Sequence, residues 1–166
     1  MKKLLCSIFI ILQTAAIYSK PSLSLSASIA PAISFIDDSI YSEFNASIAA
    51  GFIAKKTKDF NYGASITTSL LTASNTINRK FLPSRINTSV LIDFGFKIHD
   101  EIINITSLHL GYMHYPKINA GQLEYGITSG FYGEITKNLY IGLPISLSIS
   151  KIEKRIMAEL SLRYIR

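Results

Sequence analysis

Ser22–Phe35, with the sequence SLSLSASIAPAISF, decides the fold of this chain. Its odd-numbered positions, from Leu23 to Phe35, are apolar, and serine occupies most of the even-numbered positions. Successive side chains of a β-strand point to opposite faces, so this stretch predicts a strand with one apolar face and one hydroxyl face.

The same alternation recurs along the rest of the chain, over segments of about ten residues that end in short polar breaks. It predicts eight strands, at Ser22–Phe35, Phe44–Ala54, Phe60–Leu71, Arg85–Ile98, Ile102–Tyr115, Leu123–Ile135, Leu139–Ile149 and Arg155–Tyr164. Asn104 and Thr106 fall on the apolar face of their strand, which favours a bulge near its start.

The first residues predict an export signal that is cleaved off. Met1-Lys2-Lys3 is basic, and Leu4–Ile17 is mostly apolar but too short to span a bilayer as a helix. We expect cleavage after Ser19, with Ala16 as the alternative, so that residues 1–19 are a signal peptide and residues 20–166 are the mature domain.

Composition agrees with export to a membrane. Mean hydropathy is +0.29, yet no apolar stretch of about 20 residues follows the signal. A hydrophobic chain of this kind must bury its apolar face in a core or close into a barrel. The net charge of +6 falls to +4 without Lys2 and Lys3, and the chain has no tryptophan, so nucleic-acid binding is not expected. Cys6 is the only cysteine, so the mature chain has no disulfide or cysteine nucleophile.

The polar face indicates which side of the sheet meets lipid. It is mostly Ser, Thr, Asn and Gly, whereas a soluble barrel would expose Lys and Glu. The strands are long enough to cross a bilayer, which takes about 9–11 tilted residues. Aromatic residues gather near both strand ends, as two membrane interfaces favour: Phe52, Phe60, Tyr62, Phe96 and Tyr164 at one, and Phe35, Phe44, Tyr112 and Tyr125 at the other. We therefore predict an all-β fold, an eight-stranded antiparallel up-and-down transmembrane β-barrel, with a soluble ligand-carrying periplasmic barrel as the alternative.

Connection lengths predict the orientation of the barrel. Placing both termini in the periplasm gives short turns there, at Lys55–Asp59, His99–Glu101 and Thr136–Asn138. The outer loops are then Ile36–Glu43, Thr72–Ser84, Pro116–Gln122 and Ser150–Lys154. Short periplasmic turns and longer outer loops are typical of outer-membrane barrels.

Strand number, alternation, aromatic belts and a strand at the C-terminus together resemble the small eight-stranded outer-membrane barrels of the OmpX/OmpA/OmpW-like group. The resemblance covers residues 20–166 and implies a monomer in the bacterial outer membrane. In that group the last strand ends in an aromatic residue that the assembly machinery recognises. Leu160–Tyr164 fits this pattern, with Ile165-Arg166 beyond it.

Several polar or charged residues are expected to face the barrel interior. They are Asp93, Lys97, His109, Glu124, Glu134, Glu159 and Arg163. Two hypotheses account for them. They form either a charged path for small solutes or a salt-bridged plug, because the interior of an eight-stranded barrel is about as wide as its own side chains. Buried charges of this kind must be paired.

The outer loops predict a basic rim. Its residues are Arg79, Lys80, Arg85, Lys117, Lys151, Lys154 and Arg155, against the acidic Asp37, Asp38, Glu43 and Glu153. A basic rim can hold lipopolysaccharide-type and other anionic lipid headgroups, or host polyanions.

Catalysis is weakly supported. Gly111–Gly121 resembles slightly the His-x-Ser-Asn-Ala segment of lipid A deacylases, with His114 as the base, but Pro116 stands where the nucleophilic serine would be. No two histidines have ligand spacing, so no metal or cofactor is expected. The predicted function is a non-catalytic structural or surface-interaction role, with a narrow pore and a lipid-modifying enzyme as alternatives.

Overall fold

The computed structural model describes residues 21–37, 39–55, 57, 59–72, 74–75 and 81–166. The predicted signal peptide lies outside them, as do Arg79 and Lys80. The elements are β1 (Ser22–Ile36), β2 (Ser39–Lys55), β3 (Phe60–Leu71), β4 (Ser74–Asn75), β5 (Phe81–Leu82), β6 (Arg85–His99), β7 (Ile102–Tyr115), η1 (Pro116–Ile118), β8 (Ala120–Thr136), β9 (Leu139–Ser150), β10 (Glu153–Ala158) and β11 (Leu160–Ile165).

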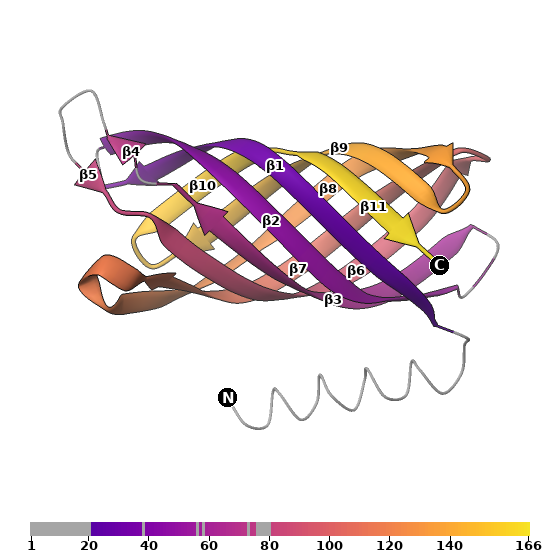
Figure 1. The fold of residues 1–166 in the computed structure, drawn as a ribbon, viewed down its shortest axis with the longest axis horizontal. Helices are drawn as coiled ribbons and strands as arrows, with labels where there is room; N and C mark the ends of the chain where they lie inside the picture. The colour runs from indigo at the N-terminus through magenta and orange to yellow at the C-terminus, as the bar shows by residue number, and fades with distance from the viewer. Residues whose placement is uncertain (1–20, 38, 56, 58, 73, 76–80) are drawn as a thin grey trace.

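The strands close into one antiparallel barrel (Figure 1). Each long strand pairs with the next along the chain, and β1 pairs with β2 on one side and with β10 and β11 on the other. Since β10 and β11 together occupy one position in the ring, the barrel has eight positions, and the predicted eight-stranded up-and-down architecture is confirmed. The short strands β4 and β5 form a separate hairpin.

The eighth position is split at Glu159 because prolines lie on both neighbouring strands. Pro31 of β1 and Pro144 of β9 have no N–H to donate to a ladder. The registers of β10 and β11 against these strands stop on either side of Glu159. The Glu159 N–H still donates to the Pro144 carbonyl at 2.8 Å, so the strand direction continues across the break.

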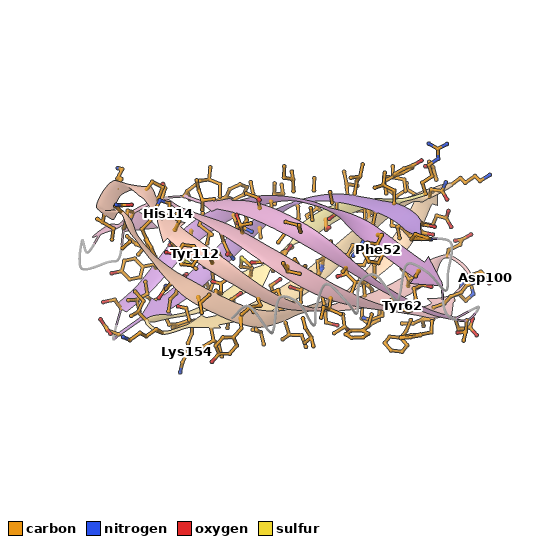
Figure 2. The ribbon with its side chains drawn as sticks, turned by 90° about the horizontal axis from the view of Figure 1, so that it is seen from below. Phe52, Tyr62, Asp100, Tyr112, His114 and Lys154 are labelled. Carbon is orange, nitrogen blue, oxygen red and sulfur yellow. The ribbon has the colours of Figure 1, made fainter. Side chains whose placement is uncertain are left out.

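The outer face of the barrel is apolar, as the alternation predicts. Ile48, Leu143 and Phe131 are each at least 60% exposed, and the neighbouring outward positions are also large and apolar. Figure 2 shows side chains projecting outward along the ribbon, with Phe52 and Tyr62 toward one end and Tyr112 toward the other. Such a face suits hydrocarbon rather than water. None of the helices among the described residues is long and apolar enough to cross a membrane.

The hairpins extend further than predicted. Residues 39–43, expected in a loop, belong to β2, and β1 pairs with β2 as far as Ile36 opposite Ser39. Residues 120–122 likewise belong to β8. Alternation did not show this because the pattern is broken here: the large Tyr41 is buried inside beside Glu43, and the polar Ser42 is exposed outside.

The bulge predicted near the start of β7 has a counterpart in the structure, because the register against β6 shifts between Lys97 and His99, but Asn104 and Thr106 lie outside it. β6 and β7 pair without a register shift from Ile86 to Lys97. Asn104 and Thr106 point outward and satisfy each other: Asn104 Nδ2 donates to the Gly130 carbonyl, and Thr106 Oγ1 donates to Asn104 Oδ1 at 3.2 Å. The same register turns Ile103 and Ile105 inward. The irregular start of this strand therefore has two parts: an exchange of faces at residues 103–106, where the ladder is regular, and a register shift next to it, between Lys97 and His99 opposite Ile103 and Ile102.

Candidate functional site: the barrel interior

The interior is filled in layers between two ends. We call the end with residues 37, 72, 81–84, 116–119 and 151–152 the loop end, and the end with residues 57, 59, 100–101, 137–138 and the C-terminus the turn end. From the loop end, the layers are an apolar roof, an ion cluster, a polar chamber, one buried ion pair and an apolar floor.

The roof consists of Tyr41, Leu82, Met113 and Tyr115, which pack together and are all less than 8% exposed. Tyr41 comes from β2, Leu82 from β5, and Met113 and Tyr115 from β7. The β4–β5 hairpin therefore contributes one side chain to the roof. Tyr115 also contacts the layer below, because its hydroxyl donates to Glu153 and accepts from Gln122 Nε2 at 2.9 Å.

The ion cluster consists of Glu43, Arg85, Glu124, Glu153 and Arg155. Arg85 is fully buried and holds Glu43 in a two-pronged contact, with Nη1 to Oε1 at 2.6 Å and Nη2 to Oε2 at 2.7 Å. Its Nη2 also contacts Glu153 Oε1 at 2.5 Å. This planar pairing is the geometry that arginine forms best with carboxylates.

Arg155 continues the cluster across the barrel. Its Nη1 lies 3.0 Å from Glu153 Oε1, and its Nη2 lies 2.5 Å from Glu124 Oε2. Asn87 Nδ2 donates to the other oxygen of Glu124 at 2.7 Å. Three carboxylates and two guanidinium groups thus share a layer that is almost inaccessible to solvent, and paired charges are the arrangement that makes such burial tolerable.

Below the ion cluster lies a chamber of about 90 Å³, lined mainly by hydroxyl groups. A chain of hydrogen bonds crosses five neighbouring ring positions there, from Ser47 through Ser28, Glu159 and Ser146 to Thr128. His109 also lines it, with Nε2 3.2 Å from Ser148 Oγ and 3.9 Å from Glu124. The serines that alternate along β1, β2 and β9 therefore form the interior of the barrel.

A single ion pair separates the chamber from the floor. Arg163 Nη2 lies 2.5 Å from Asp93 Oδ2, and both residues are buried. Ser107 donates to Asp93, and Arg163 Nε donates to Ser24 Oγ at 3.0 Å. The predicted lumen residues Asp93, His109, Glu124, Glu159 and Arg163 thus all line the chamber.

The floor at the turn end consists of Ile103, Ile105 and Tyr132. Tyr132 lies directly opposite Gly142 on β9, and a Cβ at Gly142 would come within 2.4 Å of the tyrosine ring. Because Gly142 has no Cβ, the ring of Tyr132 can lie against its backbone and extend across the barrel. Alternation alone missed this layer, because Ile103 and Ile105 occupy positions that it assigns to polar residues.

Lys97 and Glu134 do not join the interior network in which they were expected. Lys97 Nζ pairs with Asp100 Oδ1 at 2.7 Å, and this hydrogen bond lowers the pKa of the exposed Asp100 carboxyl in the turn. Glu134 Oε1 accepts from the N–H of Asn138, whose φ is 72°. Both side chains stabilise tight turns because they lie within four residues of the turn they contact.

Arg85 and Arg155 lie inside the barrel, which corrects their predicted place on the basic rim. Both are at most 2% exposed. The reason is register: Arg85 shares its face with Asn87, and Arg155 shares its face with Glu159, all of which point inward. The alternation of side chains along each strand predicts that both arginines point inward, whereas their nearness to the loops suggested that they belong to the rim.

The remaining described rim residues are exposed lysines. Lys117 follows Pro116 in η1, Lys151 lies in the turn between β9 and β10, and Lys154 points outward from β10 (Figure 2). Glu43 and Glu153, counted above against the rim, are buried in the ion cluster.

His114 lies near the loop end on the outer face (Figure 2). Among the described residues, no hydroxyl group forms a hydrogen bond with its imidazole. The pairing of a nucleophile with a base that acyl transfer requires is therefore not assembled in the part of the chain that the structure describes. That part also holds no group of three or more His, Cys, Asp or Glu residues suited to a metal ion.

No family model matches the chain. No curated protein matches it either. Several solved structures, however, match the chain. The attachment invasion locus protein Ail of Yersinia pestis has a TM-score of 0.57 at 14% identity, with 87% of this chain and 98% of Ail covered. Neisserial surface protein A has a TM-score of 0.57 at 12% identity, with 86% and 96% covered. Ail bound to the heparin analogue sucrose octasulfate has a TM-score of 0.51 at 14% identity, with 88% and 99% covered.

These similarities are at the level of the fold, because the identities are low. They agree with the eight-position ring, the apolar outer face and the polar interior described above. The chain therefore has the fold of the small eight-stranded outer-membrane β-barrels to which Ail and Neisserial surface protein A belong.

Proposed function

We propose that this protein is a monomeric integral barrel of the bacterial outer membrane that acts through its outer surface, as a structural or surface-interaction protein, and neither catalyses a reaction nor conducts solutes. The observation that carries the proposal is the layered filling of the interior. The roof and the floor are apolar, and the ion cluster spans the barrel between the roof and the chamber. A hydrated solute would have to break both apolar layers and the buried ion pairs to pass.

The orientation follows from the predicted periplasmic termini. The loop end then faces the cell exterior, and the aromatic residues at the two ends lie at the two membrane interfaces. The strand β11, with Tyr164 near its end, is then available to the assembly machinery, as the resemblance to this group implies.

Conductance measurements test whether the barrel is a pore. In planar bilayers the wild-type protein is expected to produce no single-channel steps, because both ends of the lumen are filled. Asp93→Asn and Arg163→Ala are expected to produce none either, since the roof and floor remain in place. Reproducible steps in the wild type that change in these two variants would show that the narrow-pore alternative is correct.

The loop end supports binding of polyanions. Burial of Glu43 and Glu153 removes two acidic groups from this end, and Lys117, Lys151 and Lys154 stay exposed. Phosphate and sulfate groups are attracted to such clusters by about 1 kcal/mol per lysine near a charged surface. We therefore assign the surface role to anionic ligands, such as the phosphates of lipopolysaccharide.

Binding of heparin and of lipopolysaccharide vesicles tests this assignment. The triple variant Lys117→Ala, Lys151→Ala and Lys154→Ala should lose up to about 3 kcal/mol of binding free energy, roughly a hundredfold in affinity, and the salt dependence should weaken. Lys137→Ala is the matched control, because Lys137 is an exposed lysine at the turn end. Equal losses in the two variants would mean that binding does not occur at the loop end.

A further inference from the structure

Charges that point into the lumen do not balance. Five carboxylates point into the lumen, at Glu43, Asp93, Glu124, Glu153 and Glu159, against three guanidinium groups, at Arg85, Arg155 and Arg163. Each arginine already contacts one or two of the first four carboxylates. The excess of acid is therefore concentrated in the chamber and the layer directly above it.

Glu159 is the carboxylate without a basic partner. Among the described residues, no lysine, arginine or histidine nitrogen lies within 4.0 Å of its oxygens. Its neighbours are hydroxyls: Ser28 Oγ donates to Oε2 at 2.9 Å, and Ser146 Oγ donates to Oε1. Glu159 is partly buried, and neutral hydroxyl donors offset only part of the cost of its partial removal from water, so a cation at this position would stabilise the carboxylate.

Asn45 supplies a second, independent indication. It is 3% exposed, it lines the same chamber, and its Oδ1 accepts no hydrogen bond. Asn45 pairs with Ala30 of β1. On the other side of β1, Ile29 pairs with Leu160, the residue that follows Glu159. Ala30 is small and fully buried. Asn45 and Glu159 both line the chamber, one on either side of Ala30. A buried carbonyl oxygen without a donor is rare in folded proteins and calls for a partner.

We propose that the chamber binds a hard metal cation, with Glu159 as its charged ligand and Asn45 Oδ1 as a neutral ligand. Hydroxyl oxygens of Ser28, Ser47 and Ser146 line the same space and complete an all-oxygen donor set. Carboxylate, amide and hydroxyl oxygens suit Ca²⁺, Mg²⁺ or Na⁺, and the absence of thiolate and imidazole from this set disfavours zinc and copper. The chamber volume of about 90 Å³ accommodates an ion with several water ligands.

Entry to this site is coupled to folding. The roof and the ion cluster fill the lumen toward the loop end and the floor fills it toward the turn end, so the chamber is most accessible to an ion while the strands assemble. Refolding from urea in the presence or absence of the cation is therefore the correct way to load and to empty the site.

Retained metal tests the proposal directly. The full barrel is refolded into detergent with Ca²⁺ or Mg²⁺, exchanged into buffer with EDTA, and measured by elemental analysis. The wild type should retain about one ion per chain. Glu159→Gln should retain none, and Asn45→Ala should retain less than the wild type. Glu101→Gln is the matched control, because Glu101 is an exposed carboxylate in a turn. Equal retention in Glu159→Gln and the wild type would overturn the proposal.

Thermal unfolding followed by gel mobility covers Na⁺ and confirms folding of each variant. Samples refolded in NaCl, in CaCl₂ or in choline chloride of matched ionic strength are compared. The wild-type midpoint should rise with at least one metal cation, whereas that of Glu159→Gln should not respond and should exceed that of the wild type in choline. A wild-type midpoint that responds to none of the metal cations would overturn the proposal.

Discussion

Replacing Arg85 by methionine is expected to lower the free energy of unfolding by about 3–5 kcal/mol. The side chain of Arg85 is wholly buried between those of Glu43 and Glu153, whose exposed fractions are 0% and 1%. Methionine has a similar length but no charge, so the variant leaves two carboxylates without their shared cation. Urea unfolding of the protein in lipid vesicles, followed by the change in electrophoretic mobility, measures the loss.

Neutralising both partners separates charge from packing. The variant Arg85→Met, Glu43→Gln, Glu153→Gln should recover most of the lost stability, because buried ion pairs replaced together by neutral groups cost little. Lys154→Ala is the control, since Lys154 is exposed at the same end of the barrel and should change stability by less than about 0.5 kcal/mol. The ion cluster is not a paired structural layer if Arg85→Met is as stable as the wild type, or if the triple variant is as unstable as the single one.

Gly130→Ala is expected to destabilise the barrel by about 1–3 kcal/mol. A Cβ at Gly130 would lie 2.3 Å from the Cα of Pro144 on the neighbouring strand. Backbone atoms cannot rotate away as a side chain can, so β8 and β9 would have to separate next to the break at Glu159. The same urea unfolding assay measures the effect.

Gly133 provides the matched comparison on the same strand. A Cβ there would meet no heavy atom within 4 Å. Gly133→Ala should therefore change stability by no more than about 0.5 kcal/mol. Similar losses in the two variants would contradict the close approach of Gly130 to Pro144 and would point to a general effect of alanine in β8.

Strands and their faces were predictable because they depend on local geometry. A period of two in Ser22–Phe35 specifies which side chains share a face, and two of the strands, Phe60–Leu71 and Ile102–Tyr115, have the predicted bounds. The small-polar character of one face also predicted that serines fill the interior. Predictions failed where the faces exchange character, at Ile103 and Ile105 and at residues 39–43, because there the barrel fills its own ends with apolar side chains.

Two properties decide which residues belong to the interior network: the face of the strand on which they lie and their distance from a turn. Asp93, His109, Glu124, Glu159 and Arg163 were predicted from strand parity and lie in the chamber. Arg85 and Arg155 were assigned to the rim from their place in the chain. Lys97 and Glu134 have the expected parity, but they lie so close to a turn that local contacts hold them.

By itself the sequence determined the number of strands, their alternation and the side of the sheet that meets lipid, since each of these follows from the backbone geometry of consecutive residues. Tertiary structure alone decided which charges meet. Arg85 contacts Glu43, 42 residues away, and Glu153, 68 residues away, because closure of the ring brings β2, β6 and β10 around one narrow lumen. Closure also placed Asn45 and Glu159 on either side of Ala30, where no pattern along the chain could have paired them.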